Sequence, residues 1–258
     1  DQSGSNSNNG GRVVFSIKDI TSINRGSKYN SYSYSGDGVC SWTGTTPGST
    51  TLTKKICDIG SDTNTPLEET LYESYLYYRG LLPFYGNQNR NSEITPLEDS
   101  TARASGTYYS PILEDPSFQT QDNDGNGSIN INDLSCETAN IVLMTDGEPY
   151  NDDDAHSKIN TLTSDANCIT SGSDGNCLDE LSKYMFQNDL DADSSNDKQN
   201  IITHTVGFTT NQVLLQNTAT NGGGKYYTAN DASELESAFE DIFGGINDAT
   251  ASFTSPSS

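Results

Sequence analysis

The sequence predicts an α/β fold with a doubly wound, mostly parallel β-sheet. Four consecutive apolar residues, Ile141–Met144, are typical of a strand that is covered on both faces, so we expect the strand 140–145 near the centre of the sheet. From residue 140 onward, strand and helix patterns alternate. The apolar strand stops at Asp146-Gly147, which places an acid where open α/β sheets hold their ligands.

The first quarter of the chain predicts little regular structure. Residues 1–11 are polar and indicate a loop, and residues 12–17 (RVVFSI) indicate a strand. Residues 21–63 are rich in Ser, Gly, Tyr and Thr and have no helical period. We interpret them as an elaborated loop that contains a small hairpin.

A helix is predicted to begin at Thr65-Pro66-Leu67-Glu68. Thr is a favoured N-cap, Pro suits the first turn, and a Glu three residues after the Thr completes a capping box. The apolar residues that follow are spaced three or four apart, as on one face of a helix: Leu67, Leu71, Tyr75, Tyr78 and Leu82. The same four letters recur at 95–98 without such a period and predict only a turn.

The later elements follow from the same kinds of pattern. A helix is marked by Leu178, Leu181, Tyr184 and Met185. A strand at 200–208, a helix at 211–220 and a strand at 225–228 come next. The capping box Asp231–Glu234 opens a last helix, whose apolar face is Leu235, Ala238, Phe239, Ile242 and Ile246. Residues 251–258 resemble the start of a linker, which leaves 1–250 as one domain.

The composition limits the classes of partner. The formal net charge is -23, with 36 acids against 13 Lys and Arg among 258 residues. Such a surface repels nucleic acid and anionic membranes, and suits divalent cations and an extracellular setting. No apolar stretch approaches the roughly 18 residues of a membrane span, so we expect no membrane insertion. No signal peptide is visible, so we expect Asp1 to be a processed or excised start.

The five cysteines predict disulfides in an oxidising compartment rather than a zinc site. They include no Cys-x-x-Cys pair, and only two histidines could join them as ligands. Cys168 and Cys177 flank a Gly/Ser-rich loop, and we expect them to pair. Cys40 with Cys57 is a second, weaker pairing, and Cys136 would then be left for a partner outside the chain.

Residues 122–133 match a calcium loop of the EF-hand type. Gly127 at position 6 permits the sharp turn, and Ile129 stands at position 8. The oxygen ligands at positions 1, 3, 5, 7 and 12 are Asp122, Asp124, Asn126, Ser128 and Asp133. No helix pattern flanks this loop, and the alternative is a plain acidic turn. The acidic runs 152–154 and 189–197 lack this spacing and are expected to be solvated loops.

Nothing in the sequence indicates an enzyme. A Ser or Cys nucleophile needs a His beside it, but His204 lies within a strand pattern, where a satisfied core imidazole is usual. His156 lies in a polar loop. Gly224-Lys225-Tyr226 lacks the hydroxyl residue of a phosphate-binding loop.

A series of short stretches, in the same order along the chain, carries a family resemblance. They are 10–13 (GGRV), 65–73 (TPLEETLYE), 109–112 (YSPI), Cys136, 140–149, 177–181 (CLDEL), 205–208 (TVGF), 215–219 (LQNTA) and 222–229 (GGGKYYTA). Together they resemble the von Willebrand factor A domain of type IV pilus tip-associated adhesins, the PilY family. The resemblance covers most of the chain.

The resemblance implies a metal-ion-dependent adhesion site at the carboxyl edge of the sheet. Its three loops supply an Asp-x-Ser-x-Ser motif, a Thr and an Asp, and the last two correspond to Thr65 and Asp146. The capping box alone would also explain Thr65. Hydroxyl and carboxylate oxygens suit Ca²⁺ or Mg²⁺.

The first loop of that site has two possible interpretations in this chain. Asp1, Ser3 and Ser5 match the motif by letter. However, GGRV at 10–13 follows the family's second strand, which makes 1–9 a loop between strands. On that interpretation the chain lacks the family's first strand, first helix and second strand.

The implied function is adhesion. The resemblance implies a module on a pilus tip or the outer surface of a bacterium, which binds a host or abiotic surface and supports pilus assembly and twitching motility. Its partners would be minor pilins or other tip subunits. The alternative is a structural domain that docks on minor pilins, with calcium only stabilising a loop.

Overall fold

The structure is a computed structural model that describes part of the chain. It covers residues 32–34, 40–42, 65–86, 103–104, 106–108, 110, 139–150, 152–164, 168, 176–190 and 198–253. Several predictions fall on residues outside these ranges. They are the strand 12–17, the turn 95–98, the calcium loop 122–133, Cys57, Cys136, the linker end and the candidate ligands Asp1, Ser3 and Ser5.

The described core is an α/β unit around a parallel sheet, as expected. The strands β5 (Ala139–Thr145), β6 (Ile201–Phe208) and β7 (Gly223–Ala229) pair in the order β5-β6-β7, and both pairings are parallel. In this register Val142 lies opposite His204, and Thr205 lies opposite Tyr226. The strands are joined by helical crossovers, which parallel pairing requires.

Among the described strands, β6 is the central one and β5 lies at an edge of the three-stranded sheet. Of the described strands, only β6 pairs on both sides. Its side chains are almost all buried, whereas Met144 of β5 is 49% exposed. The apolar run therefore indicated a strand correctly, whereas the prediction that it lies near the centre of the sheet is not decided by the three described strands.

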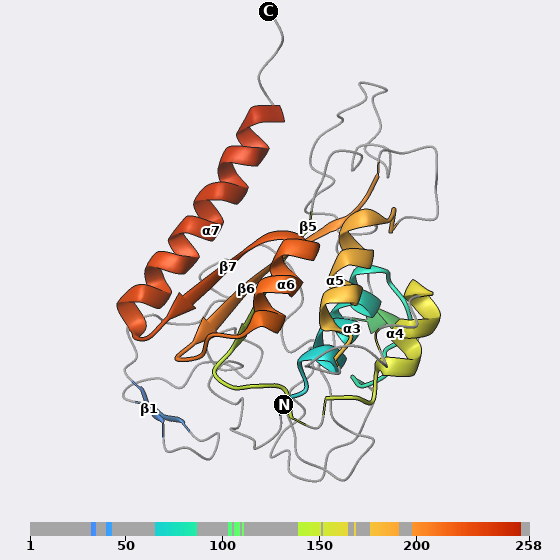
Figure 1. Cartoon of the computed structure of the whole chain (residues 1–258), viewed down its shortest axis with the longest axis horizontal. Coiled ribbons are helices and arrows are strands. Elements are labelled where there is room, and N and C mark those ends of the chain that lie inside the picture. Colours follow the sequence, from blue (N-terminus) through green and yellow to red (C-terminus); the bar gives the residue numbers. More distant parts are fainter. Residues whose placement is uncertain are drawn as a thin grey trace, which may run out of the picture.

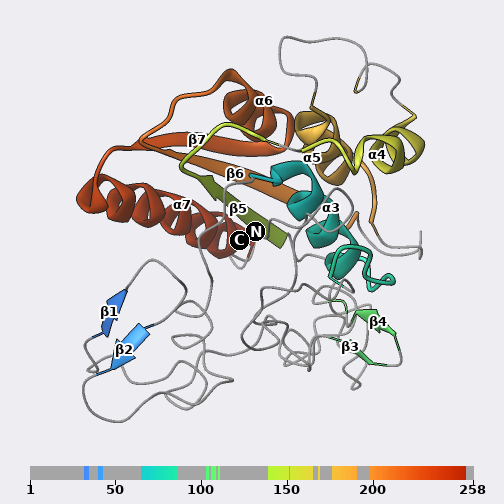
Figure 2. The same ribbon diagram turned by 90° about the horizontal axis from the view of Figure 1, so that it is seen from below.

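The helices cover both faces of the sheet. They are α3 (Leu67–Tyr78), α4 (His156–Thr163), α5 (Leu178–Gln187), α6 (Val213–Asn221) and α7 (Ala232–Phe253). Figures 1 and 2 show α6 and α7 on opposite sides of the sheet. The Ser182 hydroxyl of α5 donates to the Thr218 carbonyl of α6 at 2.8 Å, so these two helices pack side by side.

The helices predicted at 178, 211 and 231 are confirmed. The first turn of α7 is capped as expected, because Asp231 Oδ1 accepts the N–H groups of Ser233 and Glu234 at 2.8 and 2.9 Å. Ala238 and Ile242, on its apolar face, are buried. The helix α4 was not predicted, so the placement of His156 in a loop was wrong: it opens a helix.

A glycine turn joins α6 to β7 at close quarters. Gly223 has φ +70°, in the left-handed region that suits glycine. A Cβ on Gly224 would lie 2.2 Å from the Thr203 carbonyl oxygen, so only a glycine lets β7 approach β6 here.

Two small antiparallel pairs complete the described structure. Residues Tyr32–Tyr34 (β1) and Cys40–Trp42 (β2) pair within the long loop region 21–63, which confirms a hairpin there. Residues Arg103–Ala104 (β3) pair with Thr107–Tyr108 (β4). Among the described helices, none has the length and apolar character needed to cross a bilayer.

Candidate functional site

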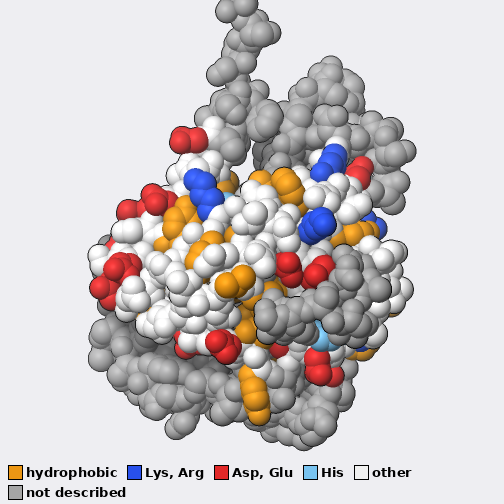
Figure 3. Space-filling model, in the orientation of Figure 1, with side chains coloured by type: hydrophobic (Ala, Val, Ile, Leu, Met, Phe, Trp, Pro, Cys, Tyr) orange, Lys and Arg blue, Asp and Glu red, His pale blue; other side chains and the backbone are white. Residues whose placement is uncertain are grey.

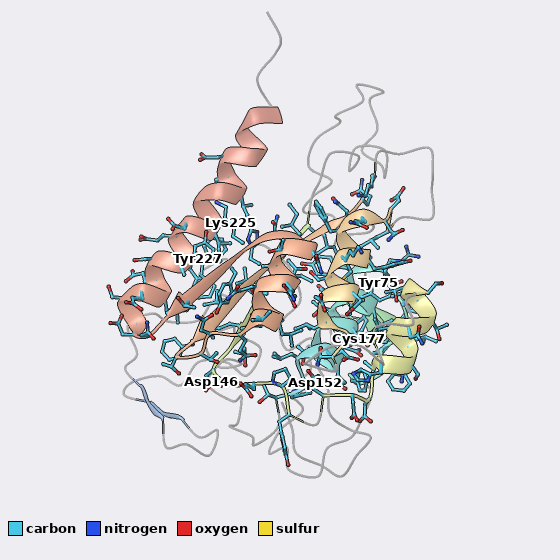
Figure 4. All side chains as sticks on the ribbon, in the orientation of Figure 1. Tyr75, Asp146, Asp152, Cys177, Lys225 and Tyr227 are labelled. Carbon is cyan, nitrogen blue, oxygen red and sulfur yellow. A yellow bond between two sulfur atoms is a disulfide. The ribbon has the colours of Figure 1, made fainter. Side chains whose placement is uncertain are left out.

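Asp146 is presented on a braced turn at the end of β5. The Thr145 hydroxyl accepts the Gly147 N–H at 3.2 Å and donates to the Gly147 carbonyl at 3.0 Å. That carbonyl also accepts the side-chain N–H of Gln212 at 2.8 Å, which ties the turn to the start of α6. Asp146 itself is exposed, and Figure 4 shows it at the edge where the strands end.

Thr65 lies beside this turn. Its N–H donates to the Tyr150 carbonyl at 3.2 Å, in an isolated antiparallel bridge. A Cβ built on Gly147 would lie 3.7 Å from the Thr65 hydroxyl oxygen. The structure therefore places the Thr65 hydroxyl beside the turn that carries Asp146, although the two segments are far apart in the sequence.

The predicted capping role of Thr65 was wrong. The N-cap of α3 is Pro66, and no side chain of that residue or of Thr65 caps the helix. The cap comes from Asp152, whose Oδ1 accepts the Glu68 N–H at 2.7 Å. The Thr65 hydroxyl is thus not occupied by a cap, which removes the alternative explanation for a Thr at this position.

Behind Thr65, three acids each cap a different helix. Asp152 caps α3. Glu69 Oε1 accepts the N–H groups of Asp154 and Ala155, just before α4, at 2.7 and 3.3 Å. Glu68 Oε2 accepts the N–H of Cys177, the N-cap of α5, at 3.0 Å. Since helix N-termini carry partial positive charge, this reciprocal arrangement stabilises the buried acids and fixes the three helices to one another.

These acids are removed from water, which changes their ionisation. Glu68 and Glu69 are fully buried and Asp152 is 8% exposed. Burial raises the pKa of Glu68 to about 9. Burial, and next a hydrogen bond to Asp152, raise the pKa of Glu69 to about 9. Burial also raises the pKa of Asp152. The expectation that 152–154 is a solvated loop is therefore wrong for Asp152.

Three residues with potential metal-ligand atoms lie inside this region. Single ligand atoms of Glu68, His156 and Cys177 lie within 4.8 Å of one another, and His156 Nε2 is 2.9 Å from Glu68 Oε2. However, Cys177 forms a disulfide with Cys168, as predicted, so its sulfur is not a thiolate. Among the described residues of this group, Glu68 and His156 are left as ligands, and a structural zinc site uses four.

His204 is a satisfied core imidazole, as expected. Its Nδ1 accepts the Lys225 N–H at 3.2 Å, so Nε2 carries the proton and faces Asn140 Oδ1 at 3.3 Å. Burial and then the Lys225 charge lower the pKa of His204. The ring thus links side-chain or backbone groups of β5, β6 and β7.

Sequence reasoning missed the acid cluster, although one signal pointed to it. The helix α3 is buried nearly all round, and the charged residues within it are all glutamates. A helix with apolar or aromatic residues on every side must carry its acids inward. The partner, Asp152, gave no comparable signal, because its contact to α3 spans 84 residues.

On the face shown in Figure 3, acidic side chains lie at scattered positions among the described residues, and Lys and Arg side chains are fewer. Comparisons with protein-family models, with curated proteins and with solved structures found no match to this chain.

Proposed function

We propose that this chain is a divalent-cation-dependent adhesion module of a type IV pilus tip protein, with the doubly wound sheet of a von Willebrand factor A domain. One observation carries the proposal: the Thr65 hydroxyl lies beside the Asp146 turn, at the carboxyl end of a parallel strand. The resemblance in the sequence assigns the ligand roles to these same two residues.

The donor set fits a hard divalent cation. Within the described residues, neither the Thr65 hydroxyl nor the Asp146 carboxylate makes a hydrogen bond, so both oxygens are available. Gln212 and Thr145 hold the turn in place from behind. A bound Ca²⁺ or Mg²⁺ would supply an open coordination position for an oxygen of the partner, and Asp1, Ser3 and Ser5 are the candidates for its remaining ligands.

The architecture supports the same proposal. Helices on opposite sides of the sheet leave the ends of its strands as the natural place for a ligand. The acidic surface would raise the local concentration of divalent cations and keep the module soluble outside the cell.

A binding experiment tests the cation site. Tb³⁺ luminescence, competed with Ca²⁺ and Mg²⁺, would be measured in an Asp124→Ala background that silences the predicted loop 122–133. We expect Asp146→Ala and Thr65→Ala each to lower the remaining affinity at least about tenfold, which corresponds to about 1.4 kcal/mol. Glu148→Ala is the matched control, because Glu148 is exposed and two residues away on the same turn.

An adhesion experiment tests the biological role. In bacteria that carry the full-length protein, Asp146→Ala should abolish cation-dependent attachment while pili still assemble. Loss of pili on deletion of the domain, with normal attachment by Asp146→Ala, would instead favour the docking role on minor pilins. A protein found only in the cytoplasm or along the filament shaft would contradict both roles.

A further inference from the structure

The N-termini of three helices meet at the disulfide between Cys168 and Cys177. Glu68 lies in the first turn of α3, His156 is the first residue of α4, and Cys177 is the N-cap of α5. One ligand atom from each of these three residues lies within 4.8 Å of the other two. A carboxylate, an imidazole and a sulfur from three separate elements therefore converge on one point, near the labelled Cys177 in Figure 4.

Two polar atoms at this point have no hydrogen bond. Glu68 Oε2 accepts the Cys177 N–H, whereas Glu68 Oε1 is buried and has no hydrogen-bond partner among the described residues. His156 Nε2 lies 2.9 Å from Glu68 Oε2, but this contact lacks the alignment of a hydrogen bond. Unpaired polar atoms are costly in a protein interior. A carboxylate oxygen and an imidazole nitrogen can thus each ligate a metal ion here.

The two cysteines supply the ligands that complete a zinc site once their bond is broken. Bonded sulfurs lie about 2 Å apart, so reduction leaves the Cys168 sulfur next to that of Cys177. Two thiolates, an imidazole and a carboxylate form a set of four ligands that suits tetrahedral Zn²⁺. Zinc–ligand bonds of about 2.0–2.3 Å place such ligand atoms about 3.3–3.8 Å from one another. The sulfurs would separate, and the other ligand atoms would draw together, by about 1–2 Å.

The surroundings favour a cation at this point. Burial is the main reason that the pKa of Glu68 is raised, and the charges of Glu69, Asp153 and Glu180 raise it further. A divalent cation would relieve this repulsion between carboxylates. The partial positive charges of the three helix N-termini would offset the negative charge of the two thiolates.

We propose that the reduced chain binds one Zn²⁺ through Glu68, His156, Cys168 and Cys177. Zinc and the disulfide are then alternative ways of fastening the starts of α3, α4 and α5 to one another. Binding releases the proton of each thiol to solvent. An oxidant that carries a disulfide reverses it: the two thiolates form the S–S bond, the oxidant is reduced to two thiolates, and Zn²⁺ leaves. This site uses none of the ligands proposed at the end of β5 and does not depend on them.

Refolding with Co²⁺, a spectroscopic substitute for Zn²⁺, tests the proposal. The full chain would carry Ser in place of Cys40, Cys57 and Cys136, so that one cysteine pair remains. Because both remaining sulfurs are buried, the chain is unfolded for reduction. A phosphine takes an oxygen from water to become its oxide, the S–S bond breaks, and each sulfur gains a proton. After refolding, we expect one Co²⁺ per chain with a thiolate-to-cobalt charge-transfer band and tetrahedral d–d bands, which Zn²⁺ abolishes. The oxidised chain should show neither band.

Single variants assign the ligands. Glu68→Gln and His156→Ala should each weaken Co²⁺ binding by the reduced chain at least about tenfold and shift the d–d bands. Asp153→Asn is the matched control, because it removes the same charge as Glu68→Gln from an exposed residue three positions before His156, and should leave the spectrum unchanged. If Glu68→Gln does not fold, His156→Ala decides, since the His156 side chain is partly exposed.

Three results would overturn the proposal. They are Co²⁺ binding without a thiolate band, a spectrum that His156→Ala leaves unchanged, and failure of the reduced chain to refold in the presence of zinc. Cation binding at the end of β5 gives no thiolate band, so the outcome is independent of the proposed adhesion function.

Discussion

His204 is held neutral by the two groups that contact its ring. Because the Lys225 N–H donates to Nδ1, protonation of that nitrogen would break a bond between β6 and β7. Burial, followed by the Lys225 charge, lowers the pKa of this imidazole. As the pH falls, His204 is therefore protonated in the unfolded chain before it is protonated in the folded chain.

We therefore expect the contribution of His204 to stability to be full at neutral pH and to be lost as pH falls below about 6.5, the ordinary histidine value. His204→Phe should remove this part of the pH dependence, at a cost of about 1–3 kcal/mol because the Lys225 N–H loses its acceptor. The ring proton NMR signals of His204 should show a depressed pKa in the wild type. A titration at the ordinary value would contradict the assignment.

His204 and Asp152 differ in how far the sequence alone could place them. His204 stands within a β-branched run, so a buried position followed from local pattern. Asp152 stands in a run of acids that resembles a solvated loop, and its burial depends on Glu68, Glu69 and Asn176, which are distant in sequence. The ligand roles of Thr65 and Asp146 stay predictions, and the placement of Thr65 beside the Asp146 turn is a tertiary fact that no local pattern encodes.

At the scale of elements, periodicity predicted those with an extended apolar face. The helices α5 and α7 and the strand β6 each bury a regular set of side chains. The helix α4 was missed because the residue that it buries fully is Ile159 alone, and one apolar residue defines no period. The order of the strands was also unpredictable, since it arises from pairing rather than from composition.

The turn between α6 and β7 permits a prediction with an internal control. Gly224→Ala would force its Cβ against the Thr203 carbonyl oxygen, 2.2 Å away, and backbone cannot yield as a side chain does. We expect a loss of at least about 2 kcal/mol in unfolding free energy. Gly244→Ala, in α7 with nothing within 4 Å of the new Cβ, should instead stabilise by about 0.5–1 kcal/mol. Chemical denaturation of the two variants checks both directions.

At the scale of the whole molecule, the net charge of -23 opposes compaction, and bound cations would relieve this repulsion. The predicted loop 122–133 is the strongest candidate from the sequence. At a hundredfold excess of Ca²⁺ over the dissociation constant, binding to the folded state alone adds about 2.7 kcal/mol.

Chelation should therefore lower the melting temperature by about 5–10 °C in a chain of this size. Asp124→Ala should remove most of that sensitivity to chelator. Asp146→Ala should leave the part of the melting-temperature shift that comes from calcium binding to the loop 122–133. Differential scanning fluorimetry with and without chelator measures both. A melting curve that chelator does not move would exclude a stabilising calcium loop.

The reciprocal caps between α3 and the segment before α4 also set an order of events during synthesis. The Glu68 N–H and the Asp152 carboxylate that accepts it are separated by 84 residues. Translation adds about 5–20 residues per second, so Asp152 is synthesised on the order of 4–17 seconds after the start of α3, which it caps. Through that interval Glu68 and Glu69 are hydrated and ionised, and the aromatic face of α3 has no partner from the sheet. The N-terminal part of the nascent chain is thus exposed to misassociation until the ribosome has passed residue 152.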